Sequence, residues 1–392
     1  MSLYDWHHQQ RRKFTQVGKW QPKSSLFLST GLRDVGLGAI AVFVPIYLYK
    51  ELGDISFVFI FMSIYHLTVI VGGFWVARII RRIGLDWSGF IGGLLRVMFF
   101  IFLMKRGSIL WLAALMWGLT SSFTWLTHHY YLAVSRKEGK FGKVVAYLML
   151  IDRWLMGLMP LIGGYILKIG GFNLMFMIAM VFLGLSGIPL FWDRFNRKNM
   201  GVSWDRVVEG KWLKSHKRVS LAFLAAGGKA VIVQTVWPIY LFLIVKDYVK
   251  VGIIQTASLL IASVVLMWLS KQVDKGNRKM MRPAVAANAI NLFVRGAVSS
   301  GLGLFFLESL YRLVANFVWV PFDAHVYETA VKEQRMEFFI RRAWLINIGG
   351  LMATVLLAGV FAAGLSWNLV FGIGGLSMAL VGVVKLENKD EK

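Results

Sequence analysis

The 392-residue chain contains no cysteine, which excludes disulfide bonds and thiolate chemistry. It is also poor in charge: Asp, Glu, Lys and Arg make up 16% of the residues, whereas soluble domains carry about a quarter. Acidic residues are fewer than basic residues, with 20 Asp and Glu against 44 Lys and Arg. Hydrophobic residues make up 57%, including 29 Phe and 16 Trp. This composition indicates a protein embedded in a membrane.

Continuous apolar runs dominate the chain. A helix needs about 20 largely apolar residues to cross a bilayer. Because the runs are continuous and do not alternate with period two, a closed β-barrel is excluded. The fold class that we predict is an all-α membrane protein with 12 transmembrane helices, at 24–50, 55–77, 87–104, 108–133, 143–168, 172–192, 218–246, 251–271, 283–300, 303–327, 337–362 and 366–385.

The net charge of +24 raises the possibility of a nucleic-acid partner, but the placement of the charges argues against one. With both termini inside, most Lys and Arg fall in the N-terminal tail, the central polar break and the inside loops. This asymmetry follows the positive-inside rule. It predicts a multi-pass protein of the cytoplasmic (plasma or inner) membrane with both termini cytoplasmic, and with basic loops against anionic lipids.

A short stretch in the first half of the chain returns in the second half. Val44-Pro45-Ile46-Tyr47-Leu48 reappears as Trp237-Pro238-Ile239-Tyr240-Leu241. Repeats of this kind, in register, predict two similar membrane halves joined head to tail, as in many secondary transporters. Three further echoes keep nearly the same separation: Arg33 with Lys229, His129-Tyr130-Tyr131 with His325-Val326-Tyr327, and Arg78 and Arg81-Arg82 with Lys275 and Arg278-Lys279.

One long polar break divides the apolar runs into six and six. It covers residues 194–217 and is too short to bury a core of its own, so we interpret it as a cytoplasmic linker. The predicted organisation is therefore two pseudo-symmetric six-helix bundles with short polar ends: a basic N-terminal tail (1–23), the first bundle (24–193), the linker (194–217), the second bundle (218–385) and a C-terminal tail (386–392).

At this point the chain resembles the major facilitator superfamily (MFS) of secondary transporters. The resemblance rests on the six-plus-six layout, the basic linker, and a basic motif, roughly G-x-x-x-D-R-x-G-R-R/K, in the 2–3 and 8–9 loops. The first copy begins at Gly73 and keeps Arg78, Arg81 and Arg82, with Ala77 where the family has an acid. The second copy has Asp274, Lys275 and Arg278. The resemblance implies that these residues, and Asp274 above all, help to latch the inner gate. Alternatively, the basic residues only set the orientation of the loops in the membrane.

A proline and glycine string in the fifth span is a weaker resemblance. Pro160-Leu161-Ile162-Gly163-Gly164 is similar to the end of a family motif, G-P-x-I-G-G, that is associated with export antiporters. Met159 replaces the first glycine of that motif. Small residues and proline in membrane helices also serve bending and close packing, so packing is the alternative interpretation.

The resemblance also implies a central cavity lined by helices 1, 4, 7 and 10. Arg33 and Lys229 stand at matching places on helices 1 and 7, and two cations suit an anionic group. A similar pair is found in the family's organophosphate antiporters. Alternatively, Arg33 pairs with Asp34 or Asp152 and Lys229 with Asp323. Further candidates for the substrate site are Gln234, Tyr47, Tyr240, Trp237, Asn316 and Arg312.

Acidic residues and a histidine inside the spans are candidates for proton coupling, because ionisable groups there are costly unless functional or paired. They are Asp34, Asp152, Asp323 and His66. Substrate that displaces a neighbouring cation would favour protonation of the carboxylate, which couples the two movements. A buried histidine satisfied by a hydrogen bond is the alternative for His66.

We therefore predict a secondary transporter that works by alternating access and favours an anionic solute. The alternatives are a proton-coupled drug or multidrug exporter and, in another class, a non-transporting membrane sensor or scaffold. An enzyme is not expected, because the sequence has no H-E-x-x-H, no G-x-S-x-G and no cysteine nucleophile. We expect a monomer with a small-molecule substrate, with protons or a counter-solute as the coupling species, and no cofactor or metal.

Overall fold

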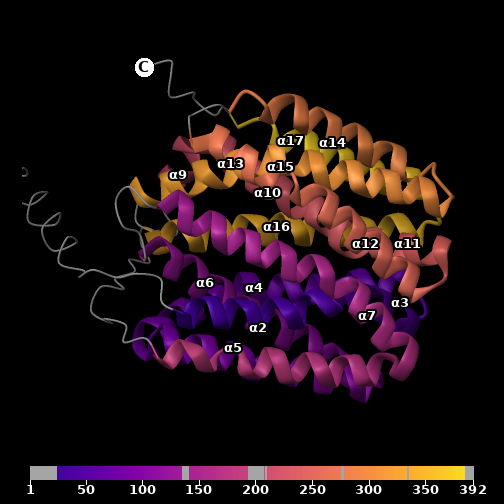
Figure 1. Ribbon diagram of the computed structural model, residues 1–392, viewed down its shortest axis with the longest axis horizontal. Helices are drawn as coiled ribbons and strands as arrows, with labels where there is room; N and C mark the ends of the chain where they lie inside the picture. The colour runs from indigo at the N-terminus through magenta and orange to yellow at the C-terminus, as the bar shows by residue number, and fades with distance from the viewer. Residues whose placement is uncertain are drawn as a thin grey trace, which may run out of the picture.

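The computed structural model describes residues 24–134, 141–192, 207, 210–274, 278–332 and 335–384. Within these ranges the chain is helical and contains no strand, which confirms the all-α fold class. In Figure 1 the helices lie side by side along the long axis of the molecule. The first half of the chain forms the lower part of this view, the second half the upper part, and α7 and α16 lie between them.

The first half is built from helices that match the first six apolar runs. One of them, α7, is two helices joined at a kink, because Gly171 has φ 65° and ψ −167°, a conformation that glycine tolerates best. The chain turns back at this point (Figure 1). The elements are α2 (Ser24–Ile40), α3 (Phe43–Leu52), α4 (Ile55–Ile83), α5 (Leu85–Lys105), η1 (Gly107–Ile109), α6 (Leu110–Val134), α7 (Phe141–Leu185) and η2 (Ile188–Trp192).

The second half repeats this pattern with more interruptions. Part of the expected linker is itself helical, since α9 lies within it. The elements are α9 (Gly210–Ser215), α10 (Lys217–Val231), the π-helix η4 (Ile232–Val236), α11 (Trp237–Val245), α12 (Tyr248–Ser263), α13 (Leu266–Asp274), α14 (Met281–Arg295), α15 (Gly301–Lys332), α16 (Arg335–Ala362) and α17 (Trp367–Val381).

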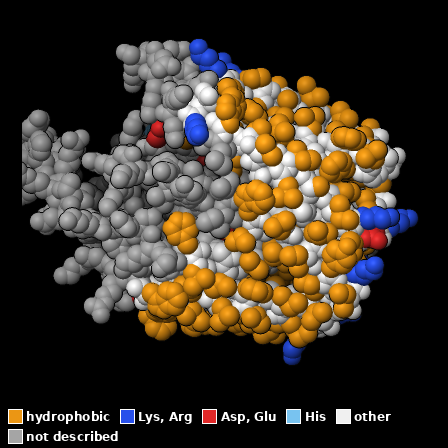
Figure 2. All heavy atoms as spheres, viewed as in Figure 1, with side chains coloured by type: hydrophobic (Ala, Val, Ile, Leu, Met, Phe, Trp, Pro, Cys, Tyr) orange, Lys and Arg blue, Asp and Glu red, His pale blue; other side chains and the backbone are white. Residues whose placement is uncertain are grey.

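Length and hydropathy identify the helices that can cross a membrane. Among the described residues seven qualify, or eight when the bent pair α2–α3 counts as one span, and α12 and α17 are shorter apolar helices. The outer surface agrees, because hydrophobic side chains cover most of the described face in Figure 2. Large apolar residues such as Trp75, 57% exposed, stand on this surface. The protein is thus a multi-pass membrane protein, and the count of twelve spans stays a prediction.

The prolines of the repeated PIYL interrupt both helices that carry them. Proline lacks an N–H, and its ring clashes with the carbonyl four residues earlier. Before Pro45 the helix breaks between α2 and α3 with a bend of 44°. Before Pro238 the helix is not divided by a sharp bend. Instead it continues as the wider π-helix η4. The same residue therefore has two structural outcomes in the two halves.

The most extensive contacts between the two halves are those of α4 with α16 and of α7 with α12. Across the first pair, Ser63 Oγ donates to Thr354 Oγ1 at 2.8 Å. Across the second pair, the Leu161 N–H donates to Thr256 Oγ1 at 3.1 Å. Lys50 on α3 also donates to the Tyr248 hydroxyl at 2.9 Å, at the start of α12. These contacts join the halves on the side where α3 meets α11, away from the end where α9 and the C-terminus lie (Figure 1).

The proline and glycine string of the fifth span lies at these contacts. A methyl group added to Gly163 would lie 2.1 Å from the Ala39 carbonyl oxygen on α2. One added to Gly164 would lie 2.6 Å from the Tyr248 carbonyl oxygen on α12. The glycines thus allow α7 to approach two neighbouring helices closely, which supports the packing interpretation of this string.

Candidate functional site

Arg33 on α2 lies among polar and aromatic partners in the first half. Its Nη2 atom forms an ion pair with Asp34 Oδ1 at 2.8 Å. Its Nη1 atom lies 3.3 Å from His128 Nδ1 on α6, and its guanidinium carbon 6.0 Å from the centre of the Trp125 ring. The expected alternative in which Arg33 pairs with Asp34 is therefore present. The guanidinium remains partly exposed, with 12% of its side chain accessible.

Lys229 on α10 has a related environment in the second half. Its Nζ atom lies 4.2 Å from the centre of the Trp319 ring on α15, a cation–π contact. Asp323, one turn further along α15, forms an ion pair with Arg342 of α16 at 3.3 Å. Lys229 and Asp323 interact only as charges at a longer distance. Lys229 is thus held by an aromatic ring and not by a direct ion pair with Asp323.

Both halves therefore carry a cation against a tryptophan. Arg33 and Trp125 come from α2 and α6, which are helices 1 and 4, and Lys229 and Trp319 come from α10 and α15, which are helices 7 and 10. Trp125 is 52% exposed. Trp125 was not among the residues that we expected at the site. The signal that could have found it is its separation from Arg33, which is nearly that of Trp319 from Lys229.

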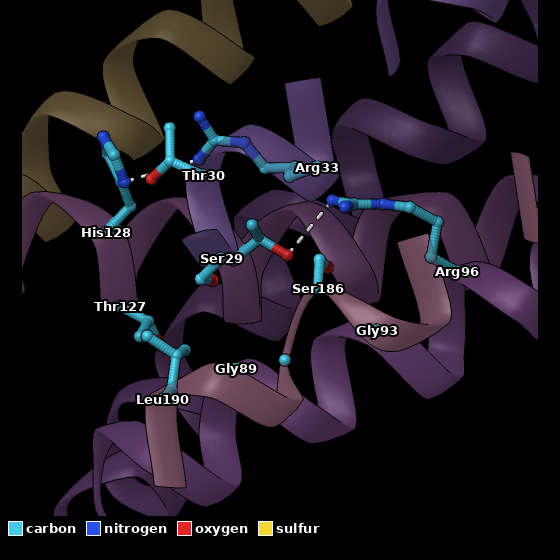
Figure 3. A pocket seen from close by; sticks show the side chains of 12 residues that line it. Ser29, Thr30, Arg33, Gly89, Gly93, Arg96, Thr127, His128, Ser186 and Leu190 are labelled. Atoms are coloured by element: carbon cyan, nitrogen blue, oxygen red, sulfur yellow. Dashed lines mark hydrogen bonds between the residues drawn. The ribbon is translucent and has the colours of Figure 1, made fainter. Parts of the chain in front are cut away.

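A cavity lies next to Arg33 inside the first half (Figure 3). The centre of a water molecule can reach about 40 Å³ of it, within a hollow of about 450 Å³. A second cation, Arg96 on α5, reaches the same cavity and was not among the residues that we expected at the site. The polar lining residues come from α2, α5, α6 and the turn before η2: Ser29, Thr30, Arg33, Arg96, Thr124, Thr127, His128 and Ser186.

The two tyrosines of the PIYL repeat hold helices together within their own halves. The Tyr47 hydroxyl donates to the Leu103 carbonyl at the end of α5, 2.5 Å away. The Tyr240 hydroxyl donates to the Val298 carbonyl after α14, 2.9 Å away, and also reaches the Gly296 carbonyl at 3.3 Å. Both hydroxyls serve as helix braces, so we do not include them in the site that we propose.

The other expected substrate residues lie on the second half and have different surroundings. Gln234 is exposed within the π-helix η4. Trp237 is buried, and the guanidinium carbon of Arg295 lies 3.8 Å from its ring centre. Asn316 is also buried and donates to the Ala262 carbonyl at 2.6 Å, which joins α15 to α12. The structure therefore does not gather these residues into one group.

Arg312 belongs to a buried network that the sequence did not reveal. Arg295 Nη2 on α14 forms an ion pair with Glu308 Oε2 on α15 at 2.8 Å, and both side chains are fully buried. Arg312 bonds to the other oxygen of Glu308 and to Gln255 on α12. Only the spacing of Glu308 and Arg312 was visible in the sequence. The network satisfies charges that would be costly inside a membrane protein.

The candidates for proton coupling are dispersed. Asp34 is buried and bonded to Arg33, and Asp323 is bonded to Arg342. His66 is buried on α4, where its Nδ1 atom lies 2.9 Å from Asn347 Oδ1 on α16, across the boundary between the halves. The side chain of Asp152 lies outside the described residues. Within the described ranges no cluster of side chains could hold a metal ion.

The basic loop motif is described only in part. In the first copy Arg78 lies against the rings of Phe74 and Trp75, 4.7 and 5.7 Å from their centres, while Arg81 and Arg82 are exposed. In the second copy Arg278 forms an ion pair with Glu328 of α15 at 2.7 Å. The side chains of Asp274 and Lys275 lie outside the described residues, so a latch at Asp274 stays a prediction.

Comparison with known proteins agrees with this architecture. Residues 26–206 match the family model described as Major Facilitator Superfamily. The structure is similar to that of a variant of the nucleoside transporter NupG, with a TM-score of 0.66, 13% identity, and coverage of 91% of this chain and 97% of that one. It is also similar to a variant of the E. coli fucose:proton symporter FucP, with a TM-score of 0.61, 11% identity, and coverage of 91% and 96%. No curated protein matches the sequence.

The family match covers most of the first half, and the shared fold extends over both halves. Both structural neighbours are transporters by their descriptions. Both findings agree with the apolar helices and with the internal repeat of the sequence. The chain is therefore a multi-pass membrane protein whose first half matches the major facilitator superfamily and whose fold is similar to that of two transporters.

Proposed function

We propose that the chain moves a small anionic solute across the membrane by alternating access, with Arg33 and Lys229 binding its negative group. The observation that carries this proposal is the pair of matching cation–tryptophan contacts, one in each half. A solute held by both halves stabilises the state in which they close around it. Release follows when the halves rock apart on one side.

The chemistry of the two contacts suits an organic anion. An arginine can bind a phosphate or carboxylate with two parallel hydrogen bonds, and a lysine binds it as a point charge. The exposed ring of Trp125 offers an apolar surface for the rest of the solute. The combination favours an organophosphate or an organic acid over an inorganic ion.

Asp34 gives the proposal a coupling step. In the unloaded site it accepts hydrogen bonds from Arg33. A solute anion that takes over the guanidinium leaves this buried carboxylate without its partner, and a proton then neutralises it. Solute and proton would thus move together, and the description of one structural neighbour as a proton symporter agrees with such coupling.

Three other functions can be tested against this proposal. The neighbours are described as nucleoside and fucose transporters, and the tryptophans could equally stack on a neutral sugar or base. A drug exporter would likewise not need both cations. A sensor or scaffold would bind a solute without moving it.

Transport by the purified protein in proteoliposomes separates these functions. Arg33→Gln and Lys229→Gln should each reduce uptake of an organophosphate or dicarboxylate at least tenfold, because each removes one charge from the bound state. The matched control is Arg106→Gln, since the Arg106 side chain is 59% exposed and remote from the site. If both variants still take up the anion at the rate of the unaltered protein, the proposal is wrong. A neutral solute moved equally by all variants would identify a sugar or nucleoside transporter, and no movement under any gradient would identify a sensor.

A further inference from the structure

Arg96 is a buried cation that forms no ion pair with any carboxylate in the part of the chain that the structure describes. Its side chain belongs to α5, in the middle of the first half, and the residue is 7% exposed. Its one recorded hydrogen bond is from Nη2 to Thr124 Oγ1 of α6, at 3.1 Å. Among the described residues no carboxylate forms an ion pair with it, and the acid whose charge reaches it, Asp34, is already bonded to Arg33.

The surroundings of Arg96 differ from those of Arg295, another buried arginine. Arg295 in the second half is fully buried and meets Glu308 at 2.8 Å. A buried cation is costly unless it is paired and hydrogen-bonded. Among the described residues around Arg96, the charged neighbours are Arg33 and Asp34, and these two already form an ion pair with each other.

The charge of Arg96 faces open space. Arg96 and Arg33 both line the cavity beside α2, α5, α6 and the turn before η2, and Figure 3 shows their guanidinium groups approaching it from two sides. Hydroxyl groups of Thr30, Thr124 and Ser186 complete its wall. The accessible space of about 40 Å³ exceeds the 10–15 Å³ or so that one water needs, so a group the size of phosphate or carboxylate fits.

We propose that this cavity is an anion-binding site of the first half, centred on Arg96, that takes one small oxyanion group. The cavity lies within the first half and shares Arg33 with the proposed solute site, but it is centred on Arg96 and includes no residue of the second half. Its ligand is either a free anion or the anionic end of a larger molecule, because both present the same chemistry to Arg96.

The test uses the full-length protein in a neutral detergent, titrated with inorganic phosphate at constant ionic strength and followed by calorimetry and by thermal unfolding. Ligand that binds the folded state raises the melting temperature. We expect saturable binding by the unaltered protein, at least a tenfold loss of affinity in Arg96→Gln, and a smaller loss in Thr124→Val. Lys229→Gln should bind phosphate as the unaltered protein does, which separates this site from the proposed solute site.

Two further measurements keep the result decisive. If Arg96→Gln does not fold, Ser186→Leu tests the site by filling the cavity while both arginines remain, and it should also abolish binding. Phenyl phosphate that competes with phosphate identifies the anionic end of a larger molecule as the ligand, and failure to compete identifies a free anion. Equal phosphate affinity in the unaltered protein and both cavity variants, or loss of binding in Lys229→Gln, overturns the proposal.

Discussion

At the scale of single residues, the protein manages a small number of buried charges in different ways. Arg33 is bonded to the next residue along the chain, Asp34, and Arg295 to a residue of another helix, Glu308. Lys229 lies against an aromatic ring. Among the described residues, Arg96 forms one side-chain hydrogen bond, to the hydroxyl of Thr124. Loss of the partner should therefore affect stability differently in each case.

Loss of the Glu308 carboxylate should destabilise the protein strongly. Glu308→Gln keeps the shape of the side chain but leaves Arg295 and Arg312 with no negative charge between them. Breaking a buried pair in this way costs about 3–5 kcal/mol. We expect a marked fall in the melting temperature of the purified protein.

The matched control for that substitution is Glu51→Gln. Glu51 also pairs with an arginine, Arg106, but at 3.4 Å and with the arginine largely exposed. Surface pairs of this kind contribute about 0–1 kcal/mol. Equal effects of Glu308→Gln and Glu51→Gln on thermal unfolding would show that the buried network does not stabilise the fold.

At the scale of helices, glycine decides how closely neighbours approach. Gly163→Ala should destabilise the protein, because the added methyl would lie 2.1 Å from the Ala39 carbonyl and force α2 and α7 apart. Overpacking of this kind costs about 1–3 kcal/mol. Unfolding in denaturant or heat measures the effect.

Gly359 is the matched control, because nothing lies within 4 Å of a methyl added there. It sits inside the helix α16, where alanine is favoured over glycine by about 1 kcal/mol. Gly359→Ala should therefore be neutral or stabilising. If both substitutions change stability with the same sign, the close approach of α2 and α7 is not what the glycine string serves.

At the scale of the whole molecule, the absence of native cysteine permits a clean test of alternating access. Ser63 and Thr354 belong to different halves, and their side-chain oxygens are 2.8 Å apart. The double variant Ser63→Cys with Thr354→Cys should form a disulfide on oxidation and hold α4 against α16. We expect transport in proteoliposomes to stop on oxidation and to return on reduction.

Each single cysteine variant is the control and should transport in both redox states. Mass spectrometry of the double variant reports whether the disulfide has formed. Full transport by a quantitatively cross-linked protein would mean that the halves do not separate at this contact during the cycle.

Much of the architecture was predictable because its causes are local. Hydropathy predicted a helical membrane protein, and the two PIYL prolines lie where both helices are interrupted. The form of each interruption was not predictable, since one helix bends by 44° and the other widens to a π-helix. That choice depends on what packs against each helix.

The candidate site was predictable only in part. Arg33 and Lys229 stood out as charges in apolar sequence, but Trp125 and Arg96 looked like ordinary packing residues until their neighbours were known. Tyr47 and Tyr240 looked like cavity residues, and their hydroxyls instead brace neighbouring helices. Which face of a helix a side chain occupies depends on its rotation in the bundle.

By itself the sequence determined that this protein lies in a membrane and is helical, because the transfer of apolar side chains from water acts within each segment, and its internal repeat predicts two related halves. Only the tertiary structure decided which charges are neutralised and which face a cavity. Those outcomes depend on contacts between helices that are distant in the chain, such as Arg295 with Glu308 and Arg96 with Thr124.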